Sequence, residues 1–227
     1  MKNKFLFVLI IVLTFGFNAK SQWTNQFGSD HKWYHDIFFT DQDTGYTANW
    51  SGEIYKTVDG GINWTLKHSE SFGSWGVSFQ SPDTGFFVGS QGKIISTYDG
   101  GTTWSSITVG GANDLFDIDC PAKDTCFIAG NGVIIKTTDG GNNWQTIYTS
   151  IDWYMGIDFI NSQIGYTIGN NITKTTDGGI SWNIVNNSGG SKISCASENV
   201  CYVIKTADII SKTIDGRYYM DRFFIRK

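Results

Sequence analysis

The chain of 227 residues holds very little proline and very little arginine. Proline occurs 2 times, and all the arginines (Arg217, Arg222 and Arg226) follow Gly216. Lys and Arg together number 17 against 21 Asp and Glu, which gives a net charge of −4 with no cluster of basic residues. Proteins that bind nucleic acid need such a cluster to neutralise phosphates. The charge pattern therefore indicates no nucleic-acid partner.

Long apolar runs are also scarce, and the one that exists lies near the start of the sequence. Residues 5–17 are almost wholly apolar, follow Lys2 and Lys4, and precede the small residues Ala19 and Ser21. This order is typical of a secretory signal peptide, and the run is too short for a membrane-spanning helix. We expect a signal peptide over 1–21. Residues 22–227 should form one monomeric domain, secreted, periplasmic or on the cell surface, with no membrane span.

A short box containing Asp-Gly-Gly and a tryptophan recurs along the chain. Residues 57–64 read TVDGGINW, 97–104 read TYDGGTTW, 137–144 read TTDGGNNW and 175–182 read TTDGGISW. A fifth box begins at Thr213 and breaks where Arg217 replaces glycine and Met220 replaces tryptophan. We expect structural roles for the box residues Asp59, Trp64, Asp99, Trp104, Asp139, Trp144, Asp177, Trp182 and Asp215.

The chemistry of the box predicts a tight turn that leads into a strand. An aspartate side chain accepts hydrogen bonds from backbone N–H groups a few residues further on, and paired glycines permit positive φ values. The tryptophan then begins a strand and packs against neighbouring sheet. The aspartates recur at steps of 40, 40, 38 and 38 residues. One unit of about forty residues is therefore repeated.

Each unit also carries three apolar runs before its box. The first alternates, as in Ile37 and Phe39, which is the period of a strand with one buried face. Four short antiparallel strands in forty residues make one propeller blade. We predict an all-β propeller of five four-stranded blades, the last degenerate. The units span about 31–68, 72–108, 113–149, 152–187 and 190–227.

The unit resembles the Asp-box (BNR) repeat, and more narrowly the exported propellers that are similar to photosystem II assembly factors. The resemblance extends over roughly residues 31–216 and implies the fold more firmly than the function, because the box also occurs in sialidases and sorting receptors. In sialidases three arginines from separate blades hold the substrate carboxylate. The absence of arginine before Arg217 therefore speaks against that activity. The resemblance favours a binding or assembly module without a cofactor.

The four cysteines fall at matching positions of two units. Cys120 and Cys126, and likewise Cys195 and Cys201, stand where three other units have Phe and Gly, as in Phe39 and Gly45. These positions should face each other across the first hairpin of a blade. We predict two local disulfides, in agreement with export to an oxidising compartment. Free buried thiols are the alternative, and a metal site would need Cys and His spacings that are missing.

The competing functional hypothesis is a glycoside hydrolase that uses carboxylates on the inner strands. Such an enzyme needs two carboxyl groups a few ångströms apart with different pKa values. The candidates are Asp36, Asp117, Asp119 and Asp158. Solvated strand residues are the alternative, because Gly76 and Ser78 stand at equivalent positions. Weak hints of calcium near Asp41 and Asp43, and of zinc at His31 and His35, lack the remaining ligands. We expect no metal.

Aromatic residues outside the boxes offer a surface for an unknown protein or glycan. Most precede the first strand of a unit, a segment that should gather with its equivalents at one mouth of the central channel. The predicted partner-binding residues are Trp33, Tyr34, Trp50, Trp75, Phe116, Trp153 and Tyr154. Clustered aromatics of this kind are frequent at binding hot spots. Packing between blades is the alternative.

The ends of the chain offer two ways to complete the last blade. Trp23 resembles the start of a fourth strand and could close the ring from the N-terminal side. The tail at residues 218–226, which is rich in aromatics, could instead supply the same strand. Both cannot occupy one position. We expect a closed ring of five blades, with its weakest point at the last one.

Overall fold

The computed structural model describes residues 32–109, 111, 114–206, 209–214 and 221–224. Every regular element in these ranges is a β-strand, as the all-β prediction requires. No helix among them is long and apolar enough to cross a membrane. The predicted signal peptide, Trp23, His31 and the fifth-box Asp215 lie outside the described residues.

The strands form four antiparallel sheets. The first sheet contains β1 (Tyr34–Phe39), β2 (Gly45–Asn49), β3 (Glu53–Thr57) and β4 (Thr65–Ser69). The second contains β5 (Ser74–Phe79), β6 (Gly85–Gly89), β7 (Lys93–Thr97) and β8 (Ser105–Thr108). The third contains β9 (Leu115–Ala122), β10 (Thr125–Thr137), β11 (Gln145–Phe159), β12 (Gly165–Gly169), β13 (Ile172–Thr175) and β14 (Asn183–Asn186). The last contains β15 (Lys192–Ser197), β16 (Val200–Thr206), β17 (Ile209–Thr213) and β18 (Asp221–Phe224).

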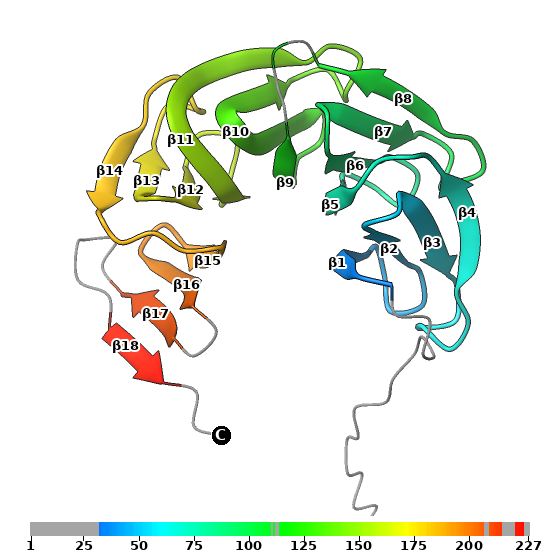
Figure 1. Ribbon diagram of the computed structural model, residues 1–227, viewed down its shortest axis with the longest axis horizontal. Helices are drawn as coiled ribbons and strands as arrows, with labels where there is room; N and C mark the ends of the chain where they lie inside the picture. Colours follow the sequence, from blue (N-terminus) through cyan, green and yellow to red (C-terminus); the bar gives the residue numbers. More distant parts are fainter. Residues whose placement is uncertain (1–31, 110, 112–113, 207–208, 215–220, 225–227) are drawn as a thin grey trace, which may run out of the picture.

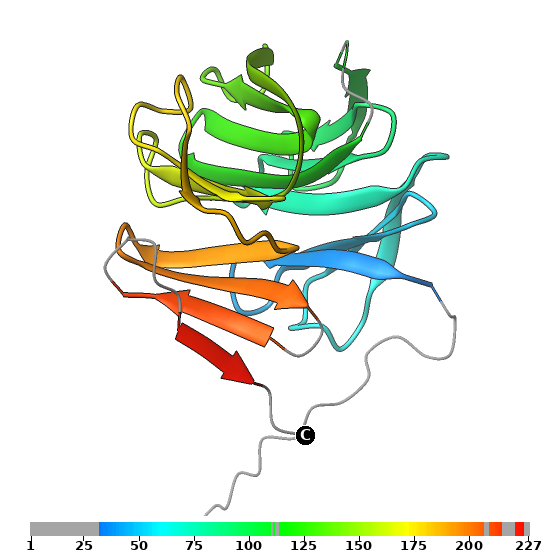
Figure 2. The ribbon, with the colours of Figure 1, turned by 60° about the vertical axis from the view of Figure 1, so that its left-hand side comes forward.

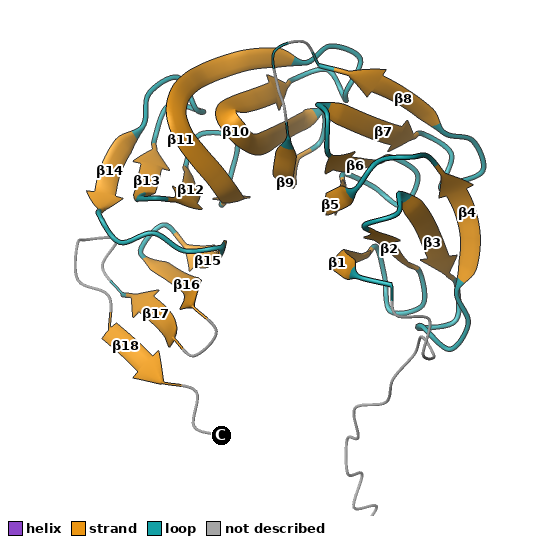
Figure 3. Ribbon diagram, viewed as in Figure 1, coloured by secondary structure: helices purple, strands orange, loops and turns teal. Residues whose placement is uncertain are grey.

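The sheets stand radially around a common centre, which is a β-propeller arrangement (Figures 1 and 3). Their inner strands pack in the order β1, β5, β9, β11 and β15. Figure 1 shows an arc whose first and last sheets stand apart, and Figure 2 shows the last sheet from the side. Among the described residues, the first and last sheets do not join into the closed ring that we expected from the sequence.

The last sheet takes its outer strand from the tail of the chain. β18 pairs with β17, with Ile209 opposite Phe224 and Lys212 opposite Asp221. Of the two alternatives for this position, the tail strand is the one in the structure. Trp23, the other candidate for this position, lies outside the described residues.

Two long strands set the third sheet apart from the others. β10 pairs with β9 through its first part and with β11 through its second part. β11 pairs in turn with β10 near Gln145 and with β12 near Phe159. In Figure 1, β11 follows the outer rim and then bends inward. One strand thus passes from the outside of one repeat unit to the inside of the next.

The core lies between consecutive repeat units. The Phe127 and Phe159 rings stack with their centroids 3.6 Å apart, and those of Tyr46 and Phe79 stack at 4.1 Å. Each half-buried box tryptophan meets a phenylalanine ring edge-on, as Trp182 meets Phe159. Both predicted disulfides are present, Cys120–Cys126 and Cys195–Cys201. The cystines close the first hairpins of their units, where the other units pack a phenylalanine ring on a glycine.

Candidate functional site

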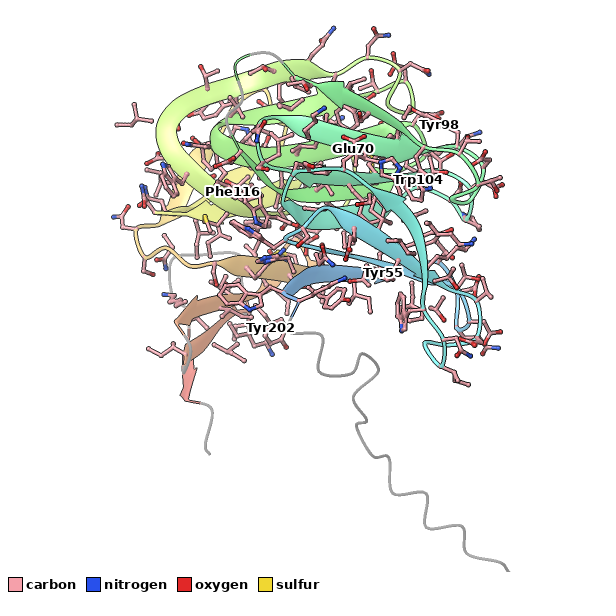
Figure 4. All side chains as sticks on the ribbon, turned by 45° about the vertical axis from the view of Figure 1, so that its right-hand side comes forward. Tyr55, Glu70, Tyr98, Trp104, Phe116 and Tyr202 are labelled. Atoms are coloured by element: carbon pink, nitrogen blue, oxygen red, sulfur yellow. A yellow bond between two sulfur atoms is a disulfide. The ribbon has the colours of Figure 1, made fainter. Side chains whose placement is uncertain are left out.

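Four aromatic side chains form a continuous row at one mouth of the arc. Trp50 follows β2, Trp75 lies on β5, Phe116 on β9 and Trp153 on β11. Successive ring centroids are 5.5, 5.4 and 6.1 Å apart. We call these four side chains the aromatic row; Phe116 is labelled in Figure 4. Trp75 and Phe116 occupy equivalent positions of successive units, and Trp50 and Trp153 reach the same mouth from other positions.

The aromatic row lines a cavity of about 410 Å³. Trp50 and Trp153 remain 56% and 55% exposed, so their rings are open to an incoming molecule. A second cavity of about 370 Å³ continues past Trp50 and is lined by Lys32, Trp33 and Ser51. An exposed apolar surface of this kind, bordered by polar groups, is typical of a binding site.

The structure brings together five of the seven predicted partner-binding residues. Trp33 joins the aromatic row through the second cavity. Tyr34 instead packs edge-on against Tyr55, with 6.1 Å between the ring centroids. Tyr154 is only 5% exposed, so its side chain lies in the core rather than on the surface. Successive strand residues point to opposite faces, so the residue after Trp153 turns into the core.

Polar residues complete the lining of the larger cavity, and the sequence did not single them out as binding residues. They are His35, Asp114, Ser191 and Lys192, together with the apolar Met155. Burial lowers the pKa of His35, and the nearby Lys192 ammonium lowers it further. A comparison of repeats could have found Lys192, because the first and third units carry Asp36 and Asp117 at its position.

Lys192 reaches across the centre of the arc to a buried carboxylate. Its Nζ lies 3.1 Å from Oδ1 of Asp117, which links β15 to β9. Burial raises the pKa of Asp117 to about 6, and Lys192 limits that rise. Burial opposes the charge of Lys192, but attraction by Asp117 and Asp36 outweighs it and raises the lysine pKa. The cavity therefore borders an ion pair whose carboxylate is buried and whose lysine side chain is 41% exposed.

The four inner-strand aspartates each bind the backbone of the following unit. The accepted hydrogen bonds come from Val77 N–H to Asp36 (3.0 Å), Ile157 N–H to Asp117 (3.1 Å), Phe159 N–H to Asp119 (2.7 Å) and Cys195 N–H to Asp158 (2.6 Å). Each carboxylate thus satisfies an N–H group of the neighbouring inner strand. These bonds join one unit to the next at two levels along the inner strands, one for Asp36 and Asp117 and one for Asp119 and Asp158.

Burial dominates the electrostatics of these aspartates. It raises the pKa of Asp119 to about 7. The hydrogen bond from the Phe159 N–H opposes this rise, and the negative charges of Asp158 and Asp117 add to it. Burial also raises the pKa of Asp158. A raised pKa is one requirement of a catalytic acid. None of the four aspartates lines the cavity of the aromatic row, however. The structure does not bring a pair of them to that opening.

The box turns use their aspartates differently. In the first box, Asn63 N–H and Thr57 Oγ1–H each donate to Asp59 Oδ1 over 2.8 Å, and Gly61 N–H donates to Thr57 Oγ1 over 2.9 Å. The other three intact boxes repeat this pattern. Both box glycines have positive φ, 68° and 89° in the first box. The threonine that opens each box is therefore as much a part of the turn as the aspartate.

These turns hold their carboxylates in the ionised form. Hydrogen bonds from Thr103 lower the pKa of Asp99 to about 2, and those from Ser181 do the same for Asp177. The pKa values of Asp59 and Asp139 are lowered for the same reason, by Asn63 and Asn143. Among the described residues, no three His, Cys, Asp or Glu side chains are grouped as a metal site would need.

Comparison with known proteins places this geometry among the propellers. Residues 70–152 match the family described as "Photosynthesis system II assembly factor YCF48". A search of the curated proteins found no match by sequence. A structure of YCF48 bound to a D1 peptide is 17% identical, covers 84% of this chain and 82% of that one, and has a TM-score of 0.52. The chain is thus a β-propeller, and it resembles that assembly factor.

Other propellers match the fold alone. The GH74 enzyme of Niastella koreensis is 14% identical, with 84% of this chain and 38% of that one covered and a TM-score of 0.68. The WD40 propeller domain of Doa1 is 9% identical, with 87% of this chain and 70% of that one covered and a TM-score of 0.70. This breadth agrees with a fold that hosts many functions. Function must therefore be argued from the site.

Proposed function

We propose that this protein is a non-catalytic propeller that binds a segment of another protein through the aromatic row. The carrying observation is the unbroken contact of Trp50, Trp75, Phe116 and Trp153 beside a cavity of about 410 Å³. Large aromatic side chains bury much area on binding and lose little conformational entropy. An apolar stretch of polypeptide fits such a row along its length.

The resemblance to YCF48 supports a protein partner rather than a substrate. That protein has been solved with a D1 peptide, and its family description is that of an assembly factor. A glycoside hydrolase is the alternative, with Asp36, Asp117, Asp119 and Asp158 as candidate carboxylates. Their hydrogen bonds to the next unit favour a structural role, because a carboxylate that accepts a backbone N–H is already engaged.

We further propose that the arc consists of five blades with Asp-box turns. The six-stranded sheet then contains two blades, because β10 and β11 each continue from one blade position into the next. The unit boundaries expected from the sequence support this division. The repeated hydrogen bonds around Asp59, Asp99, Asp139 and Asp177 support the Asp-box assignment.

Export to an oxidising compartment is part of the same proposal. Two disulfides persist where thiols are not kept reduced, and both are compatible with an extracellular or lumenal protein. The predicted cleavage near Ser21 would release the propeller from its signal peptide. N-terminal sequencing of the protein from its native host would test the position of the cut.

A paired selection tests the binding proposal. The immobilised wild-type protein is screened against random dodecamer peptides and, separately, against neutral glycans. The double variant Trp50→Ala/Trp75→Ala serves as the counter-selection, and Tyr98→Ala, an exposed aromatic on a box turn, is the matched control. We expect apolar or aromatic peptides that bind wild type and Tyr98→Ala at least tenfold more tightly than the double variant. Glycans that depend on the two tryptophans, or peptides that do not, would contradict the proposal.

A further inference from the structure

The rings of the aromatic row leave part of their faces open to a ligand. Neighbouring ring planes are inclined to each other by 58°, 40° and 26° along the row. Trp50 and Trp153 at its two ends are more than half exposed, and Trp75 and Phe116 between them are partly buried. The face of an aromatic ring carries negative charge density and attracts a cation within about 6 Å of the ring centre.

The same fold already places cations over rings elsewhere. Lys56 Nζ lies 5.2 Å from the centroid of the Tyr46 ring and donates to the Gly100 carbonyl over 2.7 Å. Lys136 repeats this arrangement in a later unit. An ammonium group between a ring face and an oxygen acceptor is thus a recurring contact. In the described residues, the rings with a lysine above them lie outside the aromatic row: Tyr46, Tyr55, Phe127, Tyr166 and Tyr202.

Asp114 supplies oxygen acceptors beside the aromatic row. It lines the same cavity and stands two residues before Phe116, and alternate residues of an extended segment point to the same side. Its Oδ1 accepts a hydrogen bond from the Gln91 N–H over 3.3 Å. The ion pairs of the described residues do not include it. A carboxylate can accept about four hydrogen bonds, so most of this capacity is left for a ligand.

Lys192 also lines the cavity, but it does not make the cavity positive. Its Nζ lies 3.1 Å from Asp117 Oδ1, and it is attracted by Asp36 as well. The pKa of Asp117 is about 6, so this carboxyl is mainly ionised at neutral pH. Burial lowers the pKa of His35, and this ring is therefore neutral at that pH. Together with Asp114, three carboxylates surround one ammonium group.

Neighbouring charges leave this balance unchanged. Lys32 in the second cavity is paired with Glu53, with 2.6 Å between Nζ and Oε2. The sequence just before Asp114 reads GGAN over 110–113 and contains no charged residue. A molecule that enters the larger cavity therefore meets ring faces and an excess of carboxylate.

We propose that the segment bound by the aromatic row carries a basic side chain, which lies over the ring faces with Asp114 as its counter-ion. This inference rests on the proposed function and names the class of partner, an apolar segment that contains an arginine or a lysine. Arginine suits the site best, because its planar guanidinium stacks on aromatic faces while its N–H groups donate to a carboxylate. An acidic segment would place its own carboxylates beside Asp114 and is rejected.

The probes are peptides recovered from the selection with random dodecamers described above. Those that depend on Trp50 and Trp75 should contain arginine or lysine more often than the starting library. The tightest arginine-containing peptide is then synthesised again with citrulline, which has the shape of arginine without its charge, and with glutamate. By titration of tryptophan fluorescence at pH 7, we expect the citrulline form to bind about tenfold more weakly than the arginine form. The glutamate form should bind most weakly, and salt should reduce the arginine preference.

Variants of Asp114 assign the preference to this carboxylate. Asp114→Asn keeps the size and removes the charge, so the preference for arginine over citrulline should fall at least threefold. Asp114→Lys should reverse the selectivity and favour the glutamate form, a gain that a misfolded protein cannot imitate. The matched control is Asp83→Asn, an exposed side chain at the other end of the hairpin of β5 and β6 from Trp75, which should keep the wild-type preference.

The inference and the proposed function fail in different ways. The inference is overturned if the citrulline form binds as tightly as the arginine form, if the glutamate form binds most tightly, or if Asp114→Asn keeps the wild-type preference. In each of these cases binding still depends on Trp50 and Trp75, so the proposed function stands. If no peptide depends on these two tryptophans, the proposed function itself is wrong and the inference falls with it.

Discussion

The aspartates of the inner strands and those of the box turns use the same side chain in opposite ways. Asp119 is largely buried, joins two repeat units through the Phe159 N–H, and has its pKa raised to about 7. Asp99 lies in an exposed turn, binds only groups within four residues of itself, and has its pKa lowered to about 2. One residue type therefore fastens the units together and also shapes the individual turns.

The difference shows that position in the repeat, rather than residue type, decides what a carboxylate does. A turn aspartate accepts several short hydrogen bonds while water still solvates it, so ionisation is favoured. Asp117, Asp119 and Asp158 accept backbone hydrogen bonds in poorly solvated places, so burial dominates and raises their pKa values. A raised pKa beside a central channel invites an enzymatic interpretation. Here each raised group accepts a hydrogen bond from the backbone of the next unit, and Asp117 is also paired with Lys192.

The largest loss of unfolding free energy should come from removing an inner-strand aspartate that bonds the backbone of the next unit. Asp119→Ala leaves the Phe159 N–H without its acceptor between two packed units. A buried donor left unpaired costs about 1–3 kcal/mol of unfolding free energy. We expect this loss at pH 5, where the wild-type carboxyl is protonated and carries no charge penalty. Urea unfolding followed by tryptophan fluorescence measures it.

Asp119→Asn is the matched control, because the amide oxygen still accepts the hydrogen bond and cannot ionise. It should be close to wild type at pH 5 and more stable than wild type at pH 8. Asp139→Ala in a box turn should show no such reversal between the two pH values. If Asp119→Asn is less stable than wild type at pH 8, the charged carboxylate itself stabilises the fold. The proposed role of Asp119 as a buried hydrogen-bond acceptor would then be wrong.

A smaller effect should appear in the pH dependence of the melting temperature. Groups whose pKa is raised on folding, Asp117 and Asp119, contribute stability below pH 4 that is lost as pH rises through about 6 to 7. Groups whose pKa is lowered, Asp99 and Asp177, contribute stability above pH 4 that is lost as pH falls through about 2. We expect a maximum near pH 4–5 by differential scanning calorimetry.

The double variant Asp117→Asn/Asp119→Asn tests the part of this profile between pH 5 and 8. The melting temperature of the variant should decline less than that of wild type over this range. Below pH 4 the two profiles should have the same shape. A wild-type profile that rises steadily from pH 5 to 8 would contradict the assignment of raised pKa values to the inner strands.

Much of the fold could be predicted from the sequence because each local pattern recurs in several repeat units. The box fixes a turn, the alternation at Ile37 and Phe39 fixes a strand, and the paired cysteines fall where two strands must face each other. The open arc could not be predicted in the same way. It depends on the curvature that accumulates over successive contacts, and no single unit encodes that angle.

The candidate site was predicted in part for the same reason. Repetition placed Trp75, Phe116 and Trp153 at one mouth, but the two-residue period of a strand turned Tyr154 inward. The bond between Lys192 and Asp117 joins residues 75 positions apart in sequence, and no local pattern signals it. The inner aspartates were candidate catalytic residues because the sequence does not show their hydrogen-bond partners. Those partners are backbone N–H groups of the following unit.

Carbon-13 NMR titration of the aspartate carboxyl groups tests the central claim most directly, because it follows each aspartate on its own. The account predicts that Asp117 and Asp119 titrate near pH 6 and 7, while Asp99 and Asp177 titrate near pH 2. Inner aspartates that titrate near pH 4, as solvated carboxyls do, would contradict it. That result would mean that these side chains are solvated rather than buried against the next unit.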